Sequence, residues 1–223
     1  PLLSAEAALR AGAGYVRLLA DWRPDGVPPE LVCVEDVATG IADERIAALL
    51  IGPGLGRGQT ARARLGAVVS CGLPMVIDAD ALMLLGPDLP LRAPCVLTPH
   101  EGEMAALERA FGLSGAALRR DRAGALARAS GAVILLKGPD SLIAAPDGSF
   151  TLAPRAPSWL AVAGSGDVLA GMIASRLAMH GDAARAAREG LWLHGEAARR
   201  AGPAFTALDL ARATRPAVRA AIV

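Results

Sequence analysis

The sequence predicts a single α/β domain in which a mostly parallel sheet lies between two layers of helices. Short apolar runs, which are typical of strands, alternate with alanine-rich helical stretches along most of the 223 residues. Glycines, prolines and single polar residues follow most of the apolar runs and mark their ends. No linker, low-complexity segment or internal repeat divides the sequence, so we expect one domain over residues 1–223.

The first part of the chain sets up the alternation. We expect, in order, a helix over 4–11, strands over 15–19 and 49–51, a helix over 60–70 and a strand over 75–77. Two glycines end the first helix, a glycine-rich turn follows the strand over 49–51, and Asp78-Ala79-Asp80 follows the strand over 75–77. Pro1 opens almost directly onto a helix, so we expect that a preceding strand and glycine-rich turn lie outside this sequence.

The second part continues the pattern and then becomes helical. We expect a strand over 96–97, a helix from about 102, a helix over 116–129, strands over 133–136, 142–145 and 150–152, and helices from Asp167 onward. The turn Pro146-Asp147-Gly148 favours a hairpin between the last two strands. Gly181 and Gly202-Pro203 are the expected breaks between the final helices.

Composition excludes several classes of function. The net charge is +1 and charged residues make up 20% of the chain, which gives no electrostatic footprint for nucleic acid or an anionic membrane. No uncharged apolar run approaches the roughly 20 residues that a membrane span needs. The arginines, including Arg119 and Arg120, are explained by solvated helix faces.

The cysteines indicate a reducing compartment. Cys33, Cys71 and Cys95 are odd in number and widely spaced, so neither a disulfide framework nor a zinc site is indicated. We therefore expect a cytoplasmic protein without a signal peptide.

The candidate functional residues gather at one predicted edge of the sheet. In sheets of this class, ligands bind beyond the carboxyl ends of the strands. The unusual residues fall at those ends: the turn over 52–56, Asp78 and Asp80, His100, Lys137 and Asp167. This shared location is stronger evidence for a site than any one of the motifs.

The most informative motif is Gly164-Ser165-Gly166-Asp167, a glycine-rich turn that runs into an apolar helix. Glycines allow a tight backbone, and the first amides of a helix favour a phosphate group. A carboxylate repels phosphate, so Asp167 makes sense as a base that takes a proton from a hydroxyl attacking that phosphate. The alternative is that Asp167 only caps the helix, and this segment alone leaves both interpretations open.

The other motifs are less specific. Lys137-Gly138 at a strand end favours a phosphate contact over an ordinary surface lysine. The Gly-Pro-Gly turn could admit a ligand close to the main chain or simply connect strand to helix; it is neither a dinucleotide fingerprint nor a Walker loop. His100 could bond a substrate, although a histidine at a helix start is more often structural.

Several further residues have ordinary structural interpretations. Asp78 and Asp80 could bind Mg²⁺ through water or act as turn acids, and for Asp80 we favour the turn. Trp159 is predicted to pack in the core. His180 and His194 have no acidic or cysteine partners at metal-binding spacing and receive no role, so the sequence predicts no protein metal site.

Taken together, the motifs resemble the ADP-dependent NAD(P)H-hydrate dehydratases of the ribokinase-like superfamily. The resemblance covers nearly the whole chain and rests on five segments in the family's order: 51–56, 78–82, 97–104, 136–141 and 163–171. The Gly-Ser-Gly-Asp motif marks only the superfamily. The Thr-Pro-His-x-Gly-Glu motif together with Gly-Pro-Gly-Leu-Gly is much more specific.

The resemblance implies a three-layer α/β/α fold and repair of a damaged cofactor. The substrate would be the 6S hydrate of NADH or NADPH, with ADP as phosphoryl donor, Mg²⁺ present, and AMP and phosphate released. Phosphorylation would turn a poor leaving hydroxyl into a good one, so that elimination restores the reduced nicotinamide. The family also implies a homotetramer and an NAD(P)H-hydrate epimerase as functional partner; no epimerase domain is visible in this sequence.

The resemblance also implies roles for particular residues. Asp167 would be the catalytic base and a substrate contact. Further substrate contacts would be Gly54, Gly56 and His100. The nucleotide contacts would be Lys137, Gly138, Pro139, Asp140, Ser141, Gly164, Ser165 and Gly166.

The sequence departs from the family pattern in places. The family's first strand, with its glycine-rich turn, is missing before Pro1. Met83 stands where asparagine is common, Ser141 replaces a frequent threonine, and 156–160 replaces an Asn-Pro-Gly-rich approach to the anion site.

Two other functions stay open at this point. A small-molecule kinase of the same superfamily, acting on a vitamin-precursor alcohol, would use the same base but keep the phosphate on its product. A nucleotide-binding module without catalysis would not need Asp167.

Overall fold

In the part of the chain that the structure describes, the strands form one six-stranded sheet and a separate two-stranded pair. The computed structural model describes residues 1–20, 26–113 and 118–222. The strands are β1 (Val16–Leu19), β2 (Leu31–Val34), β3 (Leu49–Ile51), β4 (Met75–Ile77), β5 (Cys95–Leu97), β6 (Val133–Leu136), β7 (Leu142–Ala144) and β8 (Phe150–Leu152).

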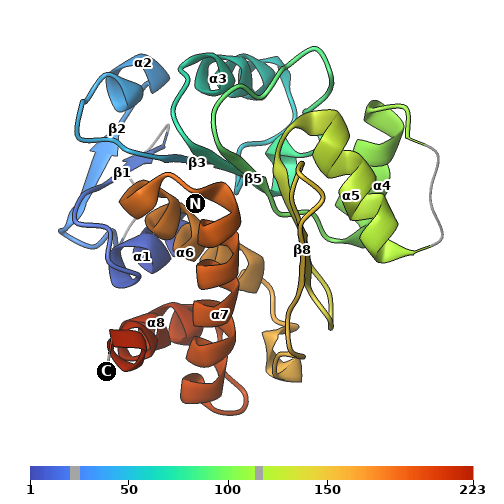
Figure 1. Ribbon diagram of the computed structural model, residues 1–223. Coiled ribbons are helices and arrows are strands. Elements are labelled where there is room, and N and C mark those ends of the chain that lie inside the picture. Colours follow the sequence, from blue (N-terminus) through green and yellow to red (C-terminus); the bar gives the residue numbers. More distant parts are fainter. Residues whose placement is uncertain (21–25, 114–117, 223) are drawn as a thin grey trace.

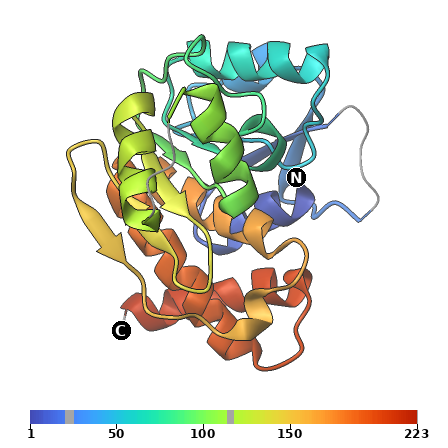
Figure 2. The ribbon, with the colours of Figure 1, turned by 90° about the vertical axis from the view of Figure 1, so that its right-hand side faces the viewer.

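The order of the main sheet is β3-β4-β5-β6-β7-β8, and β1 pairs with β2 in the second sheet. The pairs β3–β4, β4–β5 and β5–β6 are parallel, as is the pair β1–β2, whereas β6–β7 and β7–β8 at the far end are antiparallel. Figure 2 shows the β8 arrow standing at one edge of the molecule. The predicted mostly parallel sheet and its terminal hairpin are therefore confirmed.

The helices cover both faces of this sheet. They are α1 (Leu2–Arg10), α2 (Val37–Ile41), α3 (Gln59–Ser70), α4 (Glu101–Ala110), α5 (Arg119–Ser130), α6 (Ser165–His180), α7 (Ala183–Ala201) and α8 (Ala207–Ile222), with short 3₁₀ turns η1 (Ala79–Ala81) and η2 (Ser158–Leu160). Figure 1 shows α4 and α5 side by side at one end of the molecule and α6, α7 and α8 near the other.

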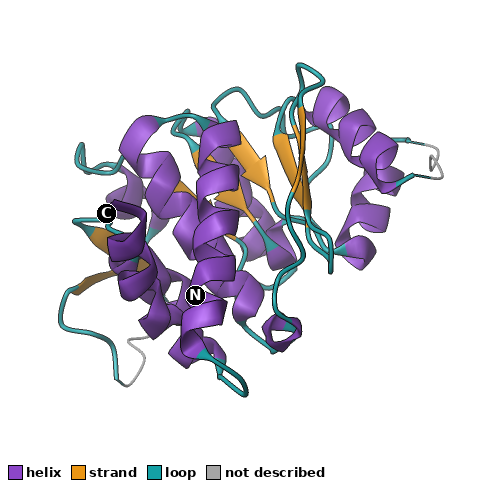
Figure 3. Cartoon of the chain, turned by 60° about the horizontal axis from the view of Figure 1, so that its bottom comes forward, coloured by secondary structure: helices purple, strands orange, loops and turns teal. Residues whose placement is uncertain are grey.

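Side chains at alternate positions of the strands point to opposite faces of the sheet, and both faces are buried under helices. In β4, Ile77 belongs to the core cluster with residues of α3, α4 and α5, whereas Val76 belongs to the cluster with α6 and α7. Successive strand side chains point to opposite faces, and a sheet buried on both faces reads as a continuous apolar run. The strands lie between the helices of the two layers in Figure 3, which confirms the predicted three-layer α/β/α fold.

A third apolar cluster holds the C-terminal helices together and includes residues of α1, α6, α7 and α8. The contact between α1 and α6 is close: a Cβ on Gly171 would stand 2.1 Å from the carbonyl oxygen of Ser4. A glycine is required there because any side chain would separate the two helices. None of the helices in the described part of the chain is both long and apolar enough to cross a membrane.

Neither β2 nor α2 is expected from the sequence, because both are short and lie in a stretch without clear periodicity. The helix expected over 116–129 is observed over Arg119–Ser130; residues 116 and 117 lie outside the described residues.

Candidate active site

The predicted gathering of functional residues at one edge of the sheet is observed. The parallel register aligns Ile51, Ile77 and Leu97 across β3, β4 and β5, and β6 continues the row. The residues that follow these strands therefore lie next to one another at the carboxyl edge. Two of them, Asp78 and Thr98, are each only 1% exposed, so this edge holds buried polar groups.

The turns after β3 and β4 touch through their backbones. Gly52 has a φ of +131°, and a Cβ at this position would stand 1.6 Å from the carbonyl oxygen of Asp78. The amide of Asp78 donates to the carbonyl of Ile51 at 3.0 Å. Only glycine fits this approach, which holds the Gly-Pro-Gly turn beside the aspartate.

The ammonium group of Lys137 lies close to two acidic side chains. Its Nζ donates to Asp78 Oδ1 at 2.8 Å and lies 3.6 Å from Glu103 Oε2. The side chains of Asp78 and Glu103 are 2% and 11% exposed. A buried carboxylate needs a partner charge, so Lys137 neutralises Asp78 across three neighbouring strands.

His100 caps helix α4. Its Nδ1 accepts from the amides of Gly102 and Glu103 at 3.0 and 3.1 Å, and Glu103 Oε2 accepts from the amide of His100 at 2.8 Å. This reciprocal arrangement is a capping box. The Nε2 atom lies 3.5 Å from Glu103 Oε1 and the side chain is 61% exposed, so a substrate contact of His100 stays a prediction.

The Gly-Ser-Gly-Asp turn starts helix α6 as predicted. Gly164 is the N-cap in a left-handed conformation with φ +87°, and a Cβ there would meet Leu3 Cδ1 at 2.8 Å. The hydroxyl of Ser165 donates inward to the carbonyl of Leu160 at 2.7 Å, and its amide donates to the carbonyl of Val162 at 3.2 Å. The hydroxyl of Ser165 therefore uses its proton within the turn, and its nucleotide contact stays a prediction.

The amides of Gly166 and Asp167 come next, at the start of the helix where backbone N–H groups lack intrahelical partners. A Cβ on Gly166 would stand 3.5 Å from Lys137 Nζ. The lysine ammonium and the helix start thus converge on one position. Both favour an anion.

Asp167 is half-buried beside this position. Burial raises the pKa of its carboxyl group, the charge of Asp78 adds to the rise, and the charge of Lys137 opposes it. A carboxylate with a raised pKa holds a proton more firmly once it accepts one. The environment therefore suits a general base better than a simple helix cap.

The segment over 137–141 forms an exposed loop next to the lysine. The hydroxyl of Ser141 accepts from the amide of Gly138 at 3.3 Å and donates to its carbonyl at 3.1 Å. Arg119 donates to the carbonyls of Lys137 and Asp140 at 3.1 and 2.7 Å. The expectation that Arg119 lies on a solvated face is wrong, because its guanidinium reaches across to this loop.

The turn over 52–56 is tied to the next strand end by Asp80. Its carboxylate accepts from the amide of Gly56 at 3.0 Å and from Arg57 Nε at 2.8 Å. The structural interpretation of Asp80 is confirmed. Gly54, beside Pro1, and Gly56 both have positive φ and lie at the same edge as the other predicted contacts.

Near the turn, the interpretation of Trp159 is wrong, and His194 makes a contact that the sequence did not predict. Trp159, which was predicted to be in the core, is 51% exposed within η2. His194, which was given no role, is 6% exposed and its Nε2 lies 2.9 Å from the carbonyl oxygen of Ser165. A histidine among apolar positions of a helix was the available signal, but its partner is 29 residues away.

Metal binding by the protein alone is not supported. No group of three or more His, Cys, Asp or Glu in residues 1–20, 26–113 and 118–222 could hold a metal ion. Asp78 is bound by Lys137 and Asp80 by Arg57. The absence of a protein metal site stays a prediction.

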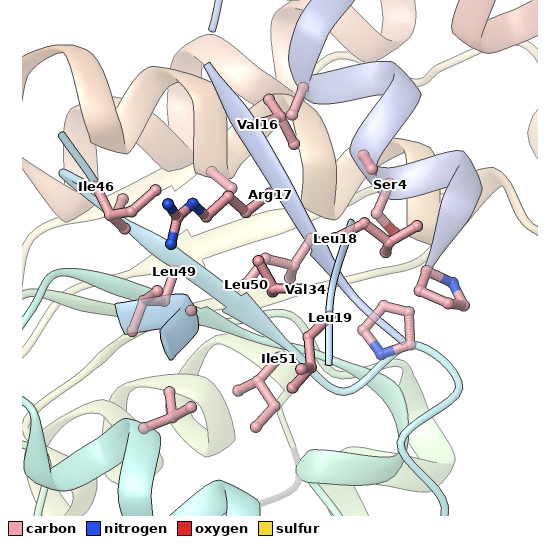
Figure 4. Close-up of a pocket in the computed structure, with 18 of the residues that line it drawn as sticks. Ser4, Val16, Arg17, Leu18, Leu19, Val34, Ile46, Leu49, Leu50 and Ile51 are labelled. Carbon is pink, nitrogen blue, oxygen red and sulfur yellow. The ribbon is translucent and has the colours of Figure 1, made fainter. Parts of the chain in front are cut away.

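An apolar groove of about 370 Å³ lies near the site, between β1 and β3. Figure 4 shows Val16 to Leu19 and Leu49 to Ile51 running side by side in the same direction, with Ser4 beside them. Pro1 and the Gly-Pro-Gly turn also line the groove. The groove therefore opens toward the same carboxyl edge.

Known proteins share this sequence and architecture. The chain is 42% identical over 195 residues to the bifunctional NAD(P)H-hydrate repair enzyme of Mycobacterium leprae, covering 84% of this chain and 38% of that protein. It is 36% identical over 217 residues to the ADP-dependent (S)-NAD(P)H-hydrate dehydratase of Neisseria meningitidis, covering 89% of this chain and 71% of that one. The chain therefore spans well under half of the bifunctional relative and most of the other.

Among solved structures, the ADP/ATP-dependent NAD(P)H-hydrate dehydratase of Bacillus subtilis, co-crystallised with ATP and Mg²⁺ and soaked with CoA, superposes with a TM-score of 0.80. Its sequence is 28% identical, and the match covers 100% of this chain and 86% of that chain. A family model described as NAD(P)H-hydrate dehydratase matches residues 1–215. The chain therefore belongs to the NAD(P)H-hydrate dehydratase family.

Proposed function

We propose that this chain carries out ADP-dependent dehydration of the 6S hydrate of NADH or NADPH and thereby restores the reduced cofactor. The observation that carries the proposal is the convergence of Lys137, the start of α6 and the half-buried Asp167 at one point. Such a point brings together an anion-binding position and a base, which phosphoryl transfer to an alcohol requires.

In the proposed reaction, Asp167 accepts the proton of the hydrate hydroxyl as its oxygen attacks the terminal phosphorus of ADP. The bond from that phosphorus to the bridging oxygen breaks, and AMP leaves. The ammonium of Lys137 and the amides of Gly166 and Asp167 stabilise the negative charge on the transferred group. The phosphate ester then leaves the ring as phosphate, a proton is lost from the neighbouring carbon, and the conjugated dihydronicotinamide is restored.

The nucleotide would lie along the loop over 137–141 and the turn over 164–166. Arg119 would keep this loop in place through its two carbonyl contacts. The hydrate would lie toward Gly54, Gly56 and His100. We propose that Mg²⁺ arrives with the nucleotide phosphates and neutralises their charge, since the described carboxylates offer no separate metal cage.

A kinase that leaves the phosphate on a vitamin-precursor alcohol is the alternative. It would use the same base and anion site, and the fate of the phosphate separates the two activities. The chain is incubated with chemically prepared hydrate and ADP or ATP, and recovery of reduced-nicotinamide absorbance is followed together with free phosphate. Absence of both signals while an alcohol becomes phosphorylated would favour the kinase.

The first prediction concerns Asp167→Asn. The amide keeps the shape of the side chain but cannot accept the proton, so we expect turnover to fall by about 10²–10⁴-fold while affinity for ADP is retained. The measurements are steady-state kinetics with the hydrate and calorimetric titration with ADP. A variant nearly as active as the unchanged chain would contradict the assigned role.

We also propose that the groove between β1 and β3 receives a first strand that joins the two sheets. Within the described residues, β1 pairs only with β2 and β3 pairs only with β4, so each presents an unpaired edge to the groove. The hydroxyls of Ser4 and Ser175 line the groove, are buried and have no hydrogen-bond partner among the described residues. Pro1 lies at the carboxyl end, next to Gly54, where a parallel strand leading into α1 would end.

The family also suggests a functional partner, an oligomeric state and a location for this chain. We propose an NAD(P)H-hydrate epimerase as functional partner, because the M. leprae relative is a bifunctional repair enzyme of which this chain matches only part. We further propose a homotetramer and a cytoplasmic location; the free thiols of Cys33, Cys71 and Cys95 support a reducing compartment.

A further inference from the structure

His194 lies directly behind the anion-binding turn. It belongs to α7 (Ala183–Ala201), is 6% exposed, and its Nε2 lies 2.9 Å from the carbonyl oxygen of Ser165 in α6. A carbonyl oxygen only accepts hydrogen bonds, so the Nε2 atom must carry the proton and donate. The bond joins α7 to α6 at Ser165, the residue at which α6 begins.

The surroundings keep this ring neutral. Burial lowers the pKa of His194 to about 4, the bond to the Ser165 carbonyl opposes the shift, and the charge of Lys137 adds to it. The start of α6 contributes further partial positive charge. At neutral pH the ring therefore acts as a neutral donor.

The position of this bond on the peptide unit gives it a consequence for the site. The carbonyl of Ser165 and the N–H of Gly166 belong to one planar trans peptide group and point in opposite directions. A donor that fixes the direction of the Ser165 carbonyl therefore also fixes the direction of the Gly166 N–H, which points the opposite way. A hydrogen bond on the carbonyl polarises the same peptide group and strengthens its N–H as a donor.

Other hydrogen bonds also hold Ser165 in place. Its hydroxyl donates to Leu160 and its amide to Val162, and its carbonyl lies in the first turn of α6. A Cβ on Gly166 would stand 3.5 Å from Lys137 Nζ, so the peptide group that follows Ser165 lies close to the lysine ammonium.

We propose that His194 is a positioning residue that aims and polarises the Gly166 amide toward the bound phosphate. The inference rests on the proposed function insofar as this phosphate belongs to the nucleotide. It does not require the dehydration step, because only binding of the anion is invoked.

The test compares two substitutions at the same position. His194→Gln places an amide N–H near the position of Nε2, whereas His194→Leu fills space without a donor. We expect His194→Leu to weaken ADP binding about tenfold, which is the effect of losing one hydrogen bond of about 1.4 kcal/mol. We expect His194→Gln to bind ADP close to the unchanged chain.

Leu193→Ala is the matched control for packing. Leu193 neighbours His194 on α7, is 3% exposed and packs in the cluster with Val168 and Met172. It should lower Tm without changing ADP affinity. If His194→Leu does not fold, His194→Asn, whose amide is too short to reach Ser165, takes its place.

The chemical shift of the Gly166 amide proton gives a second readout that a merely structural histidine would not move. We expect a shift to high field when the donor is removed and recovery in His194→Gln. Equal loss of ADP affinity in the Gln and Leu variants, or an unmoved Gly166 resonance, would overturn the proposal. If the unchanged chain binds ADP but does not dehydrate the hydrate, the proposed function fails while this test still decides the role of His194.

Discussion

At the scale of single residues, the site balances one lysine against several carboxylates. The Lys137 ammonium bonds Asp78 and lies near Glu103, and both Lys137 and Asp78 act on Asp167 through their charges. Removing one member of a buried pair leaves an uncompensated charge. The strength of Asp167 as a base therefore depends on charges that it does not contact directly.

The second prediction follows from the sign of these effects. A base works when deprotonated, so activity should fall as the pH drops through the raised pKa of Asp167. In Asp78→Asn the like charge that raises this pKa is gone and Lys137 is left to lower it. We expect the acidic limb of kcat/KM to move to lower pH, measured with the hydrate and ADP below neutral pH.

Asp88→Asn is the control for this profile. Asp88 pairs with Arg62 at the surface, and its side chain is 60% exposed, so it should leave the acidic limb unchanged. A limb that stays in place in Asp78→Asn, or moves to higher pH, would show that Asp78 does not set the basicity of Asp167.

At the scale of elements, the sequence predicted the strand ends well because parallel strands bring them to one edge. Asp78, His100 and Lys137 each follow a short apolar strand, and this local signal sufficed. The contacts of Arg119 and His194 could not be predicted in the same way. Each reaches a partner on another element, 18–29 residues away, and local periodicity carries no information about such pairs.

Trp159 shows the reverse limitation. An aromatic residue beside an apolar one favours burial on average, but η2 is a single turn before the glycine turn, and a side chain there has no opposite layer to pack against. Leu160 and Val162, rather than Trp159, pack against the apolar cluster of the C-terminal helices.

The third prediction is argued from the first turn of α6. In Gly166→Ala the added methyl would stand 3.5 Å from Lys137 Nζ, an ordinary contact that the fold accommodates. Alanine is also the better helix former, so Tm should be unchanged or slightly higher. The methyl would occupy the space in front of the ammonium, so we expect weaker ADP binding by calorimetry.

Gly124→Ala on α5 is a matched helical glycine for comparison. A Cβ there would have its nearest neighbour, Arg128 Nη1, at 3.4 Å, at a distance from the predicted nucleotide contacts. It should change Tm similarly and leave ADP affinity unchanged. Full ADP affinity in Gly166→Ala would remove Gly166 from the anion site.

At the scale of the whole molecule, the alternation of strands and helices predicted the layers, the parallel sheet and its hairpin. It did not predict β2 and α2. Their few residues are partly or fully exposed apart from Leu31, so neither element carries a strong apolar pattern. The expectation of a strand before α1 came from the start of the alternation and from the family resemblance. The unpaired edges of β1 and β3 are the places where such a strand would pair.

The last prediction tests that strand. A segment of about five apolar β-branched residues, joined to Pro1 through a short glycine turn, should enter the groove and pair with both edges. Burial of its apolar side chains, new backbone hydrogen bonds and partners for Ser4 and Ser175 would together raise Tm. The amides of β1 and β3 that face the groove should exchange more slowly with solvent, because the sheet would then be continuous. A glycine-serine segment of the same length controls for the added chain, since it cannot bury comparable area. Unchanged exchange at β1 and β3 in the apolar extension would mean that the groove does not receive a strand, and that the two sheets are separate in the native fold.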